Sequence, residues 1–426
     1  MQRVPRRAPA APLLLLWVAA AVSVLAAQMA WRGHAYWNFS DGVYLETSRL
    51  LLEGQDLYGQ VAAAQPPALF LAGAAILSAS TGLTWVHAVL SFVCLVNGVL
   101  VAVVVRRLTA RTTLAALAGL TSLVVPWTVR GHLDLTPESF AAPLLLGAAL
   151  LGVRRETAVW AGVVAALAVA FKLAFLLPVL ALVLVAPAAC RARLAAATGA
   201  TLLAGSVGAV LVWGGALVDG VVRAQAEVGF QPDVLPGYLV QAAWNVGPLG
   251  LAAAPLLRGR SVLRDQALLR SVVALAAAGL LLVGTVLKRG SYLNVIQVVE
   301  PALVILVFSA LAVTSTRIRL AQLLLLGLVL AQSVALVRAP EDPRGFSRPF
   351  SAAAGGWVLS GDEVAARVTA ARACGSTRPY SGDPYLAFLA GRRMPGDQAD
   401  LFIVRYAPAA LAPQRARQAA DQDACP

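Results

Sequence analysis

Long apolar runs separated by small clusters of arginine restrict what this chain can fold into. Of its 426 residues, 59% are hydrophobic and only 13% are charged, whereas soluble domains carry about 25% charged residues. The mean hydropathy of +0.75 is that of a protein surrounded largely by lipid. The pattern therefore predicts an all-α polytopic membrane protein, not a soluble domain with one anchor.

The apolar runs and the arginines between them predict a topology. A bilayer crossing takes about 20 apolar residues, and short loops rich in arginine stay on the cytoplasmic side. This rule puts the N-terminus in the cytoplasm and the C-terminus outside. About 11 spans are predicted, near residues 11–30, 84–105, 112–128, 137–152, 157–170, 174–189, 195–218, 238–257, 267–287, 292–314 and 320–338.

The apolar segment 68–80 is too short to cross a bilayer, since a span needs about 18 residues or more. If it did cross, Arg106, Arg107 and Arg111 would lie outside. We therefore expect an interfacial or re-entrant helix here. The first run is long and shows no clear small-x-small site before Trp31, so it is expected to be an uncleaved span. Residues 31–66 then form an outer loop.

Composition changes after residue 338, which predicts three regions: a membrane domain (1–338), a linker (339–354) and a small extracytoplasmic domain (355–426). The last is expected to be α/β. An amphipathic helix is predicted to begin at Gly361, and Leu401–Val404 is predicted to be a buried strand. Cys374 and Cys425 both lie in this domain, where an oxidising compartment permits a disulfide.

The net charge of +13 could indicate a nucleic-acid partner. The arginines are spread between spans in the positive-inside pattern, which argues against one. No C-x-x-C pair or Cys/His cluster indicates a metal site, and no glycine-rich phosphate loop indicates a nucleotide site. Acidic residues gather at the outer ends of spans. Since acids hardly affect topology, their position suggests that function lies on the outer face.

The outer loop combines an acid beside the membrane with tyrosine, glycine and paired proline. Its elements are Asp41 with Tyr44, then Gly54 with Tyr58, then Gln65 followed by Pro66 and Pro67. Their order and spacing resemble the first periplasmic loop of GT-C glycosyltransferases, which take a sugar from a polyprenyl-phosphate carrier. In that family the loop reads D-x-x-Y, L-x-x-G-x-x-x-Y and then P-P.

The resemblance implies an integral membrane glycosyltransferase of the bacterial plasma membrane, mannosyl- or arabinosyltransferase-like, acting with inversion. Asp41 would be the catalytic base, because a partly desolvated carboxylate has a raised pKa and accepts a proton more readily. The alternative is that Asp41 caps a helix beginning at Gly42.

A second acidic group contains His132, Asp134 and Glu138. In the family a second acid often lies in this loop, near the acceptor or the donor phosphate; Asp134 matches better and Glu138 is the rival. The alternative is a capping segment in which Thr136 and Pro137 start a helix. His132 could assist proton transfer or be a hydrogen-bonding surface residue.

Basic residues at outer span ends are candidates for binding the donor phosphate. Lys288 and Arg289 break the positive-inside rule, and Tyr292 follows them. Lys172 interrupts an apolar run and should face a cavity or a phosphate. The resemblance assigns all four residues, Lys172, Lys288, Arg289 and Tyr292, to binding of the donor phosphate. The alternative for Lys288 and Arg289 is snorkelling to lipid headgroups.

The transferred sugar stays open, as does the acceptor, which could be a glycan, lipid or protein. A divalent cation as cofactor is also left open. A transporter or lipid flippase of the cell envelope is the rival class, but the sequence lacks the internal repeats that it predicts. A non-catalytic scaffold is a third reading.

Overall fold

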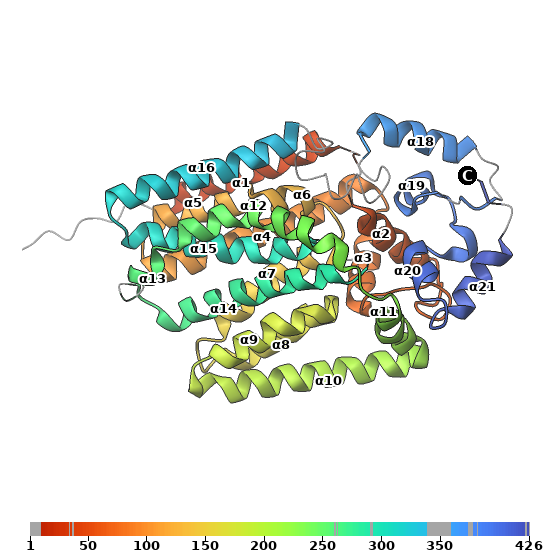
Figure 1. Ribbon diagram of the computed structural model, residues 1–426, viewed down its shortest axis with the longest axis horizontal. Helices are drawn as coiled ribbons and strands as arrows, with labels where there is room; N and C mark the ends of the chain where they lie inside the picture. The colour runs from red at the N-terminus through yellow and green to blue at the C-terminus, as the bar shows by residue number, and fades with distance from the viewer. Residues whose placement is uncertain are drawn as a thin grey trace, which may run out of the picture.

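The computed structural model describes residues 10–33, 35, 38–259, 261, 263–289, 293–338, 359–373, 378–380, 382–421 and 424–425. Within these ranges the regular elements are helices, and β-pairing is limited to isolated bridges. Most helices of the first 338 residues run along the long axis of the molecule (Figure 1). The predicted linker, 339–354, lies outside the described residues.

The α-helices are α1 (Ala10–Arg32), α2 (Phe39–Leu52), α3 (Pro67–Ala79), α4 (Leu83–Thr109), α5 (Thr112–Ser122), α6 (Pro126–Gly131), α7 (Pro137–Leu151), α8 (Ala158–Phe171), α9 (Leu176–Val185), α10 (Ala188–Val218), α11 (Ala224–Glu227), α12 (Leu235–Ala253), α13 (Leu256–Gly259), α14 (Gln266–Leu282), α15 (Ile296–Val313), α16 (Thr316–Arg338), α18 (Gly361–Ala373), α19 (Pro384–Ala390), α20 (Leu401–Tyr406) and α21 (Ala412–Ala420).

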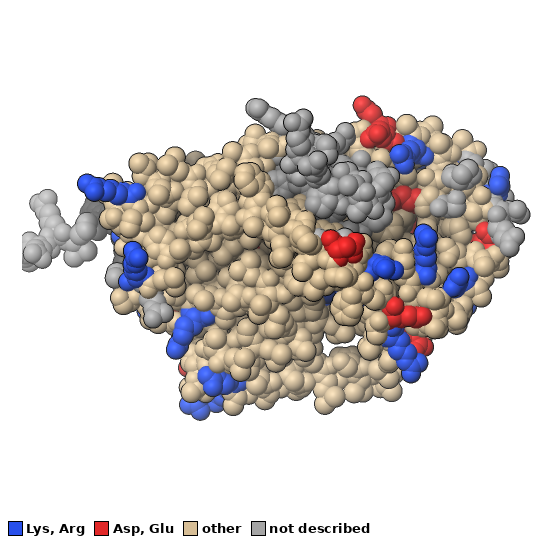
Figure 2. Space-filling model, viewed as in Figure 1, with Lys and Arg blue, Asp and Glu red and all other residues tan. Residues whose placement is uncertain are grey.

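Six helices in the described part of the chain are long and apolar enough to cross a membrane, and further apolar helices of 10–17 residues accompany them. The polytopic all-α prediction is confirmed, whereas the number of 11 spans stays a prediction. The segment predicted to be too short to span is α3, with 13 residues. On the face in Figure 2, basic residues lie toward both ends and a broad uncharged band lies between them.

Apolar helices of the bundle differ widely in burial. Helix α15 is largely apolar, and 94% of its spanning window is buried among neighbouring helices. Helix α10 is longer, with 31 residues, and also apolar, yet none of its spanning window is buried, so its apolar surface is available to lipid. Two helices predicted around Lys172 are present, and the chain is extended at that residue between them.

The C-terminal helices α18–α21 gather at one end, where α19 packs on α2 (Figure 1). Hydrogen bonds join this region to the first outer loop. The Gln398 amide donates to the Gln60 carbonyl at 2.8 Å and accepts from the Ala62 amide at 2.8 Å. The Gln414 amide donates to the Tyr58 carbonyl at 2.6 Å. The last part of the chain is therefore tied to the loop that carries the sequence motif.

The predicted helix beginning at Gly361 is confirmed as α18, but the predicted strand at Leu401–Val404 is wrong. These residues form α20, whose N-terminus is capped by Asp400: its carboxylate accepts from the Ile403 amide at 3.0 Å. A run of four apolar residues does not distinguish a strand from a buried helix by periodicity. The side chains of Ile403 and Val404 are buried, as expected.

Glycine at position 42 allows α19 to contact α2. A Cβ atom added there would lie 2.5 Å from the backbone nitrogen of Tyr385. We expect Gly42→Ala to loosen this contact and destabilise the protein by about 1–3 kcal/mol, the usual cost of overpacking. Thermal unfolding in detergent measures it. Gly205→Ala is the control, since nothing lies within 4 Å of that Cβ position, and equal melting of both variants would contradict the expectation.

Candidate active site

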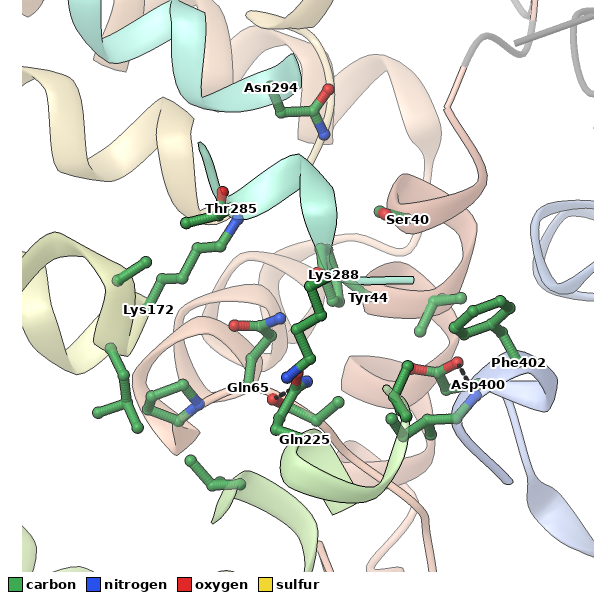
Figure 3. Close-up of a pocket in the computed structure, with 18 of the residues that line it drawn as sticks. Ser40, Tyr44, Gln65, Lys172, Gln225, Thr285, Lys288, Asn294, Asp400 and Phe402 are labelled. Carbon is green, nitrogen blue, oxygen red and sulfur yellow. Dashed lines mark hydrogen bonds between the residues drawn. The ribbon is translucent and has the colours of Figure 1, made fainter. Parts of the chain in front are cut away.

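A cavity of about 350 Å³ opens where α2, the start of α7, the end of α8, α11 and α20 meet. Much of its polar lining comes from residues singled out in the sequence. Predicted site residues that line it are Tyr44, Gln65, Pro66, Glu138, Lys172, Lys288 and Arg289. Figure 3 shows Lys172 and Asp400 on opposite sides of the view, with Lys288 between them. Segments far apart in sequence thus build one site.

Lys172 reaches the cavity because helix α8 ends there and the backbone becomes extended. Its ammonium group donates to Glu138 at 2.7 Å. Glu138 lies in the first turn of α7, which begins at Pro137 after Thr136 as the alternative predicted, although the Thr136 side chain forms no capping hydrogen bond. The Glu138 side chain is only 1% exposed, while that of Lys172 is 25% exposed. The lysine can therefore meet a ligand while keeping its carboxylate partner.

Lys288 and Arg289 follow a short 3₁₀ turn, Val283–Leu287, at the end of α14. Both line the cavity, so lipid headgroups need not be their only partners. Burial, and then the nearby Lys172 charge, lower the pKa of Lys288 to about 8. The Arg289 guanidinium lies over the Tyr406 ring, with 5.0 Å between Cζ and the ring centroid. Three cations thus face one polar space, an arrangement suited to an anion.

The first-loop motif shapes another part of the cavity wall. Tyr58 has a positive φ of 71°, and its hydroxyl donates to the Gln65 carbonyl at 2.6 Å. Pro66 precedes α3 and Pro67 is its first residue, where proline costs no backbone hydrogen bond. Tyr44 contacts Phe70 edge to face at 5.9 Å. Tyr58 and Pro67 do not line the cavity, so they act on its shape.

Asp41 lies on α2 next to the cavity-lining Ser40, but its own side chain is not part of the cavity lining. It is 1% exposed. One carboxylate oxygen accepts from the Leu135 amide at 2.6 Å, and the other has no hydrogen-bond partner among the described residues. Burial, together with the neighbouring Asp134 charge, raises the pKa of Asp41 well above its usual range. It does not cap α2: Asn38 does.

Asp134 pairs with Arg32 at the end of α1 and accepts from the Asn38 side chain at 3.1 Å. Both charged groups are 1% exposed, so Asp134 fastens α1 to the α6–α7 loop and is not in the cavity. His132 is also buried, which excludes the surface alternative. Its Nδ1 lies 2.9 Å from the Thr128 carbonyl, and it lines a separate cavity of about 10 Å³, room for about one water.

Two predicted residues, Tyr292 and Cys374, lie outside the described residues. Cys425 is disulfide-bonded. Within the described ranges no cluster of three or more metal-ligating side chains occurs. A divalent cation therefore stays an open question.

Several cavity residues were not predicted from the sequence. They are Ser40, Gln225, Asn294, Asp400 and Phe402. The sequence did contain a signal at Asp400, since an acid directly before an apolar run is typical of a helix start. Burial raises its pKa to about 6. The sequence held no such signal for Gln225 or Asn294, because an isolated amide side chain does not indicate a site.

Membrane-length helices with a cationic cavity at one end define a polytopic membrane protein with a candidate anion site. No family model matches the sequence, and no curated protein matches it either. The fold is similar to that of ArnT from Cupriavidus metallidurans, a GT-C glycosyltransferase. The structure of ArnT bound to undecaprenyl phosphate has a TM-score of 0.66 at 16% identity, covering 95% of this chain and 89% of that one. Apo ArnT gives 0.63 at 18% identity with the same coverage. The chain thus shares the fold of ArnT over 95% of its length.

Proposed function

We propose that this chain is a membrane glycosyltransferase that takes a sugar from a polyprenyl-phosphate-linked donor on the outer face of the plasma membrane. The observation that carries the proposal is the convergence of Lys172, Lys288 and Arg289 on one cavity beside the membrane helices. The fold of ArnT, a protein solved with undecaprenyl phosphate bound, supports it. The fold does not favour the transporter or flippase alternative.

The chemistry follows from these charges. An acceptor hydroxyl attacks the anomeric carbon, the bond from that carbon to the phosphate oxygen breaks, and the polyprenyl phosphate leaves with the electron pair. The three cations stabilise the negative charge that develops on the phosphate. Attack from the face opposite the phosphate inverts the anomeric centre. The sugar and the acceptor, whether a glycan, lipid or protein, are left open.

Asp41 remains our proposal for the group that takes the acceptor proton. Its raised pKa makes it a stronger base once ionised. Its side chain is buried near Tyr385 and Arg32 and does not line the cavity, so this role requires the acceptor to open a path to it. Asp41→Asn keeps an acceptor for the Leu135 amide but cannot take a proton. We expect sugar transfer to fall by about 100-fold or more, as for loss of a general base.

The experiment is transfer of radiolabelled sugar from a panel of polyprenyl-phosphate donors, in membranes carrying wild-type or variant protein. Asp400→Asn is the matched control, because asparagine also caps a helix and Asp400 lines the cavity. Transfer lost only in Asp41→Asn supports the assignment. Transfer lost only in Asp400→Asn would move the base to Asp400. No transfer from any donor by folded wild-type protein would overturn the proposed function.

A further inference from the structure

We propose that Tyr406, in the C-terminal helix α20, is a positioning residue that holds the Arg289 guanidinium for the donor phosphate. The inference rests on the proposed function and adds a part of the chain that the resemblance did not assign. The guanidinium carbon of Arg289 lies 5.0 Å from the centroid of the Tyr406 ring. This is within the distance of a cation–π contact.

The backbone around Arg289 is fixed independently of Tyr406. The Arg289 amide donates to the Gly229 carbonyl at 3.2 Å, and the Gln231 amide donates to the Leu287 carbonyl at 2.6 Å. An antiparallel bridge joins Phe230 and Lys288 between them. These bonds set where the Arg289 side chain begins. They leave its long carbon chain free to rotate, so a side-chain contact is needed to direct its charge.

Tyr406 can serve as a fixed platform because α20 is well anchored. Ile403 and Val404 are buried in one apolar cluster with Ala224 and Val228 of the α11 segment. The ring of Tyr406 lies 4.6 Å from that of Phe402, which itself lines the cavity. A rigid ring beneath a guanidinium reduces the rotamer entropy that the arginine loses when it binds.

A ring is a suitable partner for an arginine that must also bind a ligand. A carboxylate would occupy the N–H donors of Arg289 and offset its charge. A ring face attracts the cation and leaves the five N–H donors in the guanidinium plane available for phosphate oxygens. Within the described part of the chain Arg289 forms no ion pair. In contrast, Lys172 already shares its charge with Glu138.

The test is binding of undecaprenyl phosphate to the purified full chain in detergent. Variants are Tyr406→Leu, Tyr406→Phe, Arg289→Met and the double variant Tyr406→Leu/Arg289→Met. We expect Tyr406→Leu to weaken binding about two- to fivefold, as for loss of one cation–π contact. Tyr406→Phe should bind like wild type, since the ring is kept. Tyr406→Leu should have no further effect when Arg289 is already methionine.

The outcomes separate this inference from the proposed function. Failure of folded wild-type protein to bind the lipid phosphate would overturn both. Wild-type binding that Tyr406→Leu leaves unchanged would overturn the positioning role alone. Equal weakening by Tyr406→Leu with and without Arg289 would show a general structural effect and would also overturn it. Tyr406→Met serves as a second ring-free variant if the leucine variant does not fold.

Discussion

Replacing Lys288 with methionine is expected to weaken binding of undecaprenyl phosphate by about 10- to 100-fold. A hydrogen bond to a charged group contributes about 1.5–3 kcal/mol, and about 1.4 kcal/mol corresponds to a tenfold change in affinity. Lys288 lines the cavity and has no carboxylate partner among the described residues. Its whole charge is therefore available to the phosphate. Binding is measured with the purified chain in detergent.

The pH dependence of binding supplies an internal check. Binding needs the protonated lysine, and the pKa of Lys288 is lowered to about 8. Affinity should therefore fall as the pH rises above about 8. Lys288→Arg should remove this loss of affinity at alkaline pH, because arginine stays charged.

Arg223→Met is the control for loss of one positive charge, since Arg223 is an exposed residue paired with Asp219. Equal binding by wild type and Lys288→Met would contradict the assignment of Lys288 to the phosphate.

Breaking the Arg32–Asp134 pair is expected to cause the largest loss of stability. Both side chains are 1% exposed, and removal of one partner from a buried pair costs about 3–5 kcal/mol. In Arg32→Met the charge of Asp134 would be left uncompensated close to Asp41, which already feels its repulsion. Thermal unfolding in detergent should show a markedly lower midpoint for Arg32→Met than for wild type.

The exposed pair Arg223–Asp219 gives the matched comparison, with side chains 71% and 35% exposed. Arg223→Met should cost less than about 1 kcal/mol, as usual for a surface pair. Replacing both partners, in Arg32→Met/Asp134→Leu, should recover much of the stability, because neither member of the pair is then left buried without the other. Equal midpoints for Arg32→Met and Arg223→Met would contradict the role given to the buried pair.

Most of the helical architecture could be predicted from sequence, because the length of each apolar run and the position of the arginines beside it define each helix separately. The break at Lys172 and the short helix α3 were predicted in this way. The strand prediction at Leu401–Val404 failed because a short apolar run fits either structure. The capping contact of Asp400 decided between them.

The candidate site was partly predictable for a related reason. Charges that are costly near a bilayer stand out in a sequence, so Lys172, Lys288 and Arg289 were found. The position of an acidic residue in the sequence does not show whether its side chain faces the cavity or pairs with an arginine elsewhere. Asp134 and Glu138 are four residues apart, yet one pairs with Arg32 and the other with Lys172. Only the packing of distant helices separates these two environments.

The cavity wall formed by α20 has a consequence for how the protein matures. Residues 38–67 are synthesised before Asp400 and Phe402, which complete the same cavity. The glutamines at 398 and 414, which bind the first loop, also belong to this later part of the chain. A chain that is synthesised only as far as the membrane helices therefore has an unfinished cavity, which is completed when α20 packs against the first loop and α11.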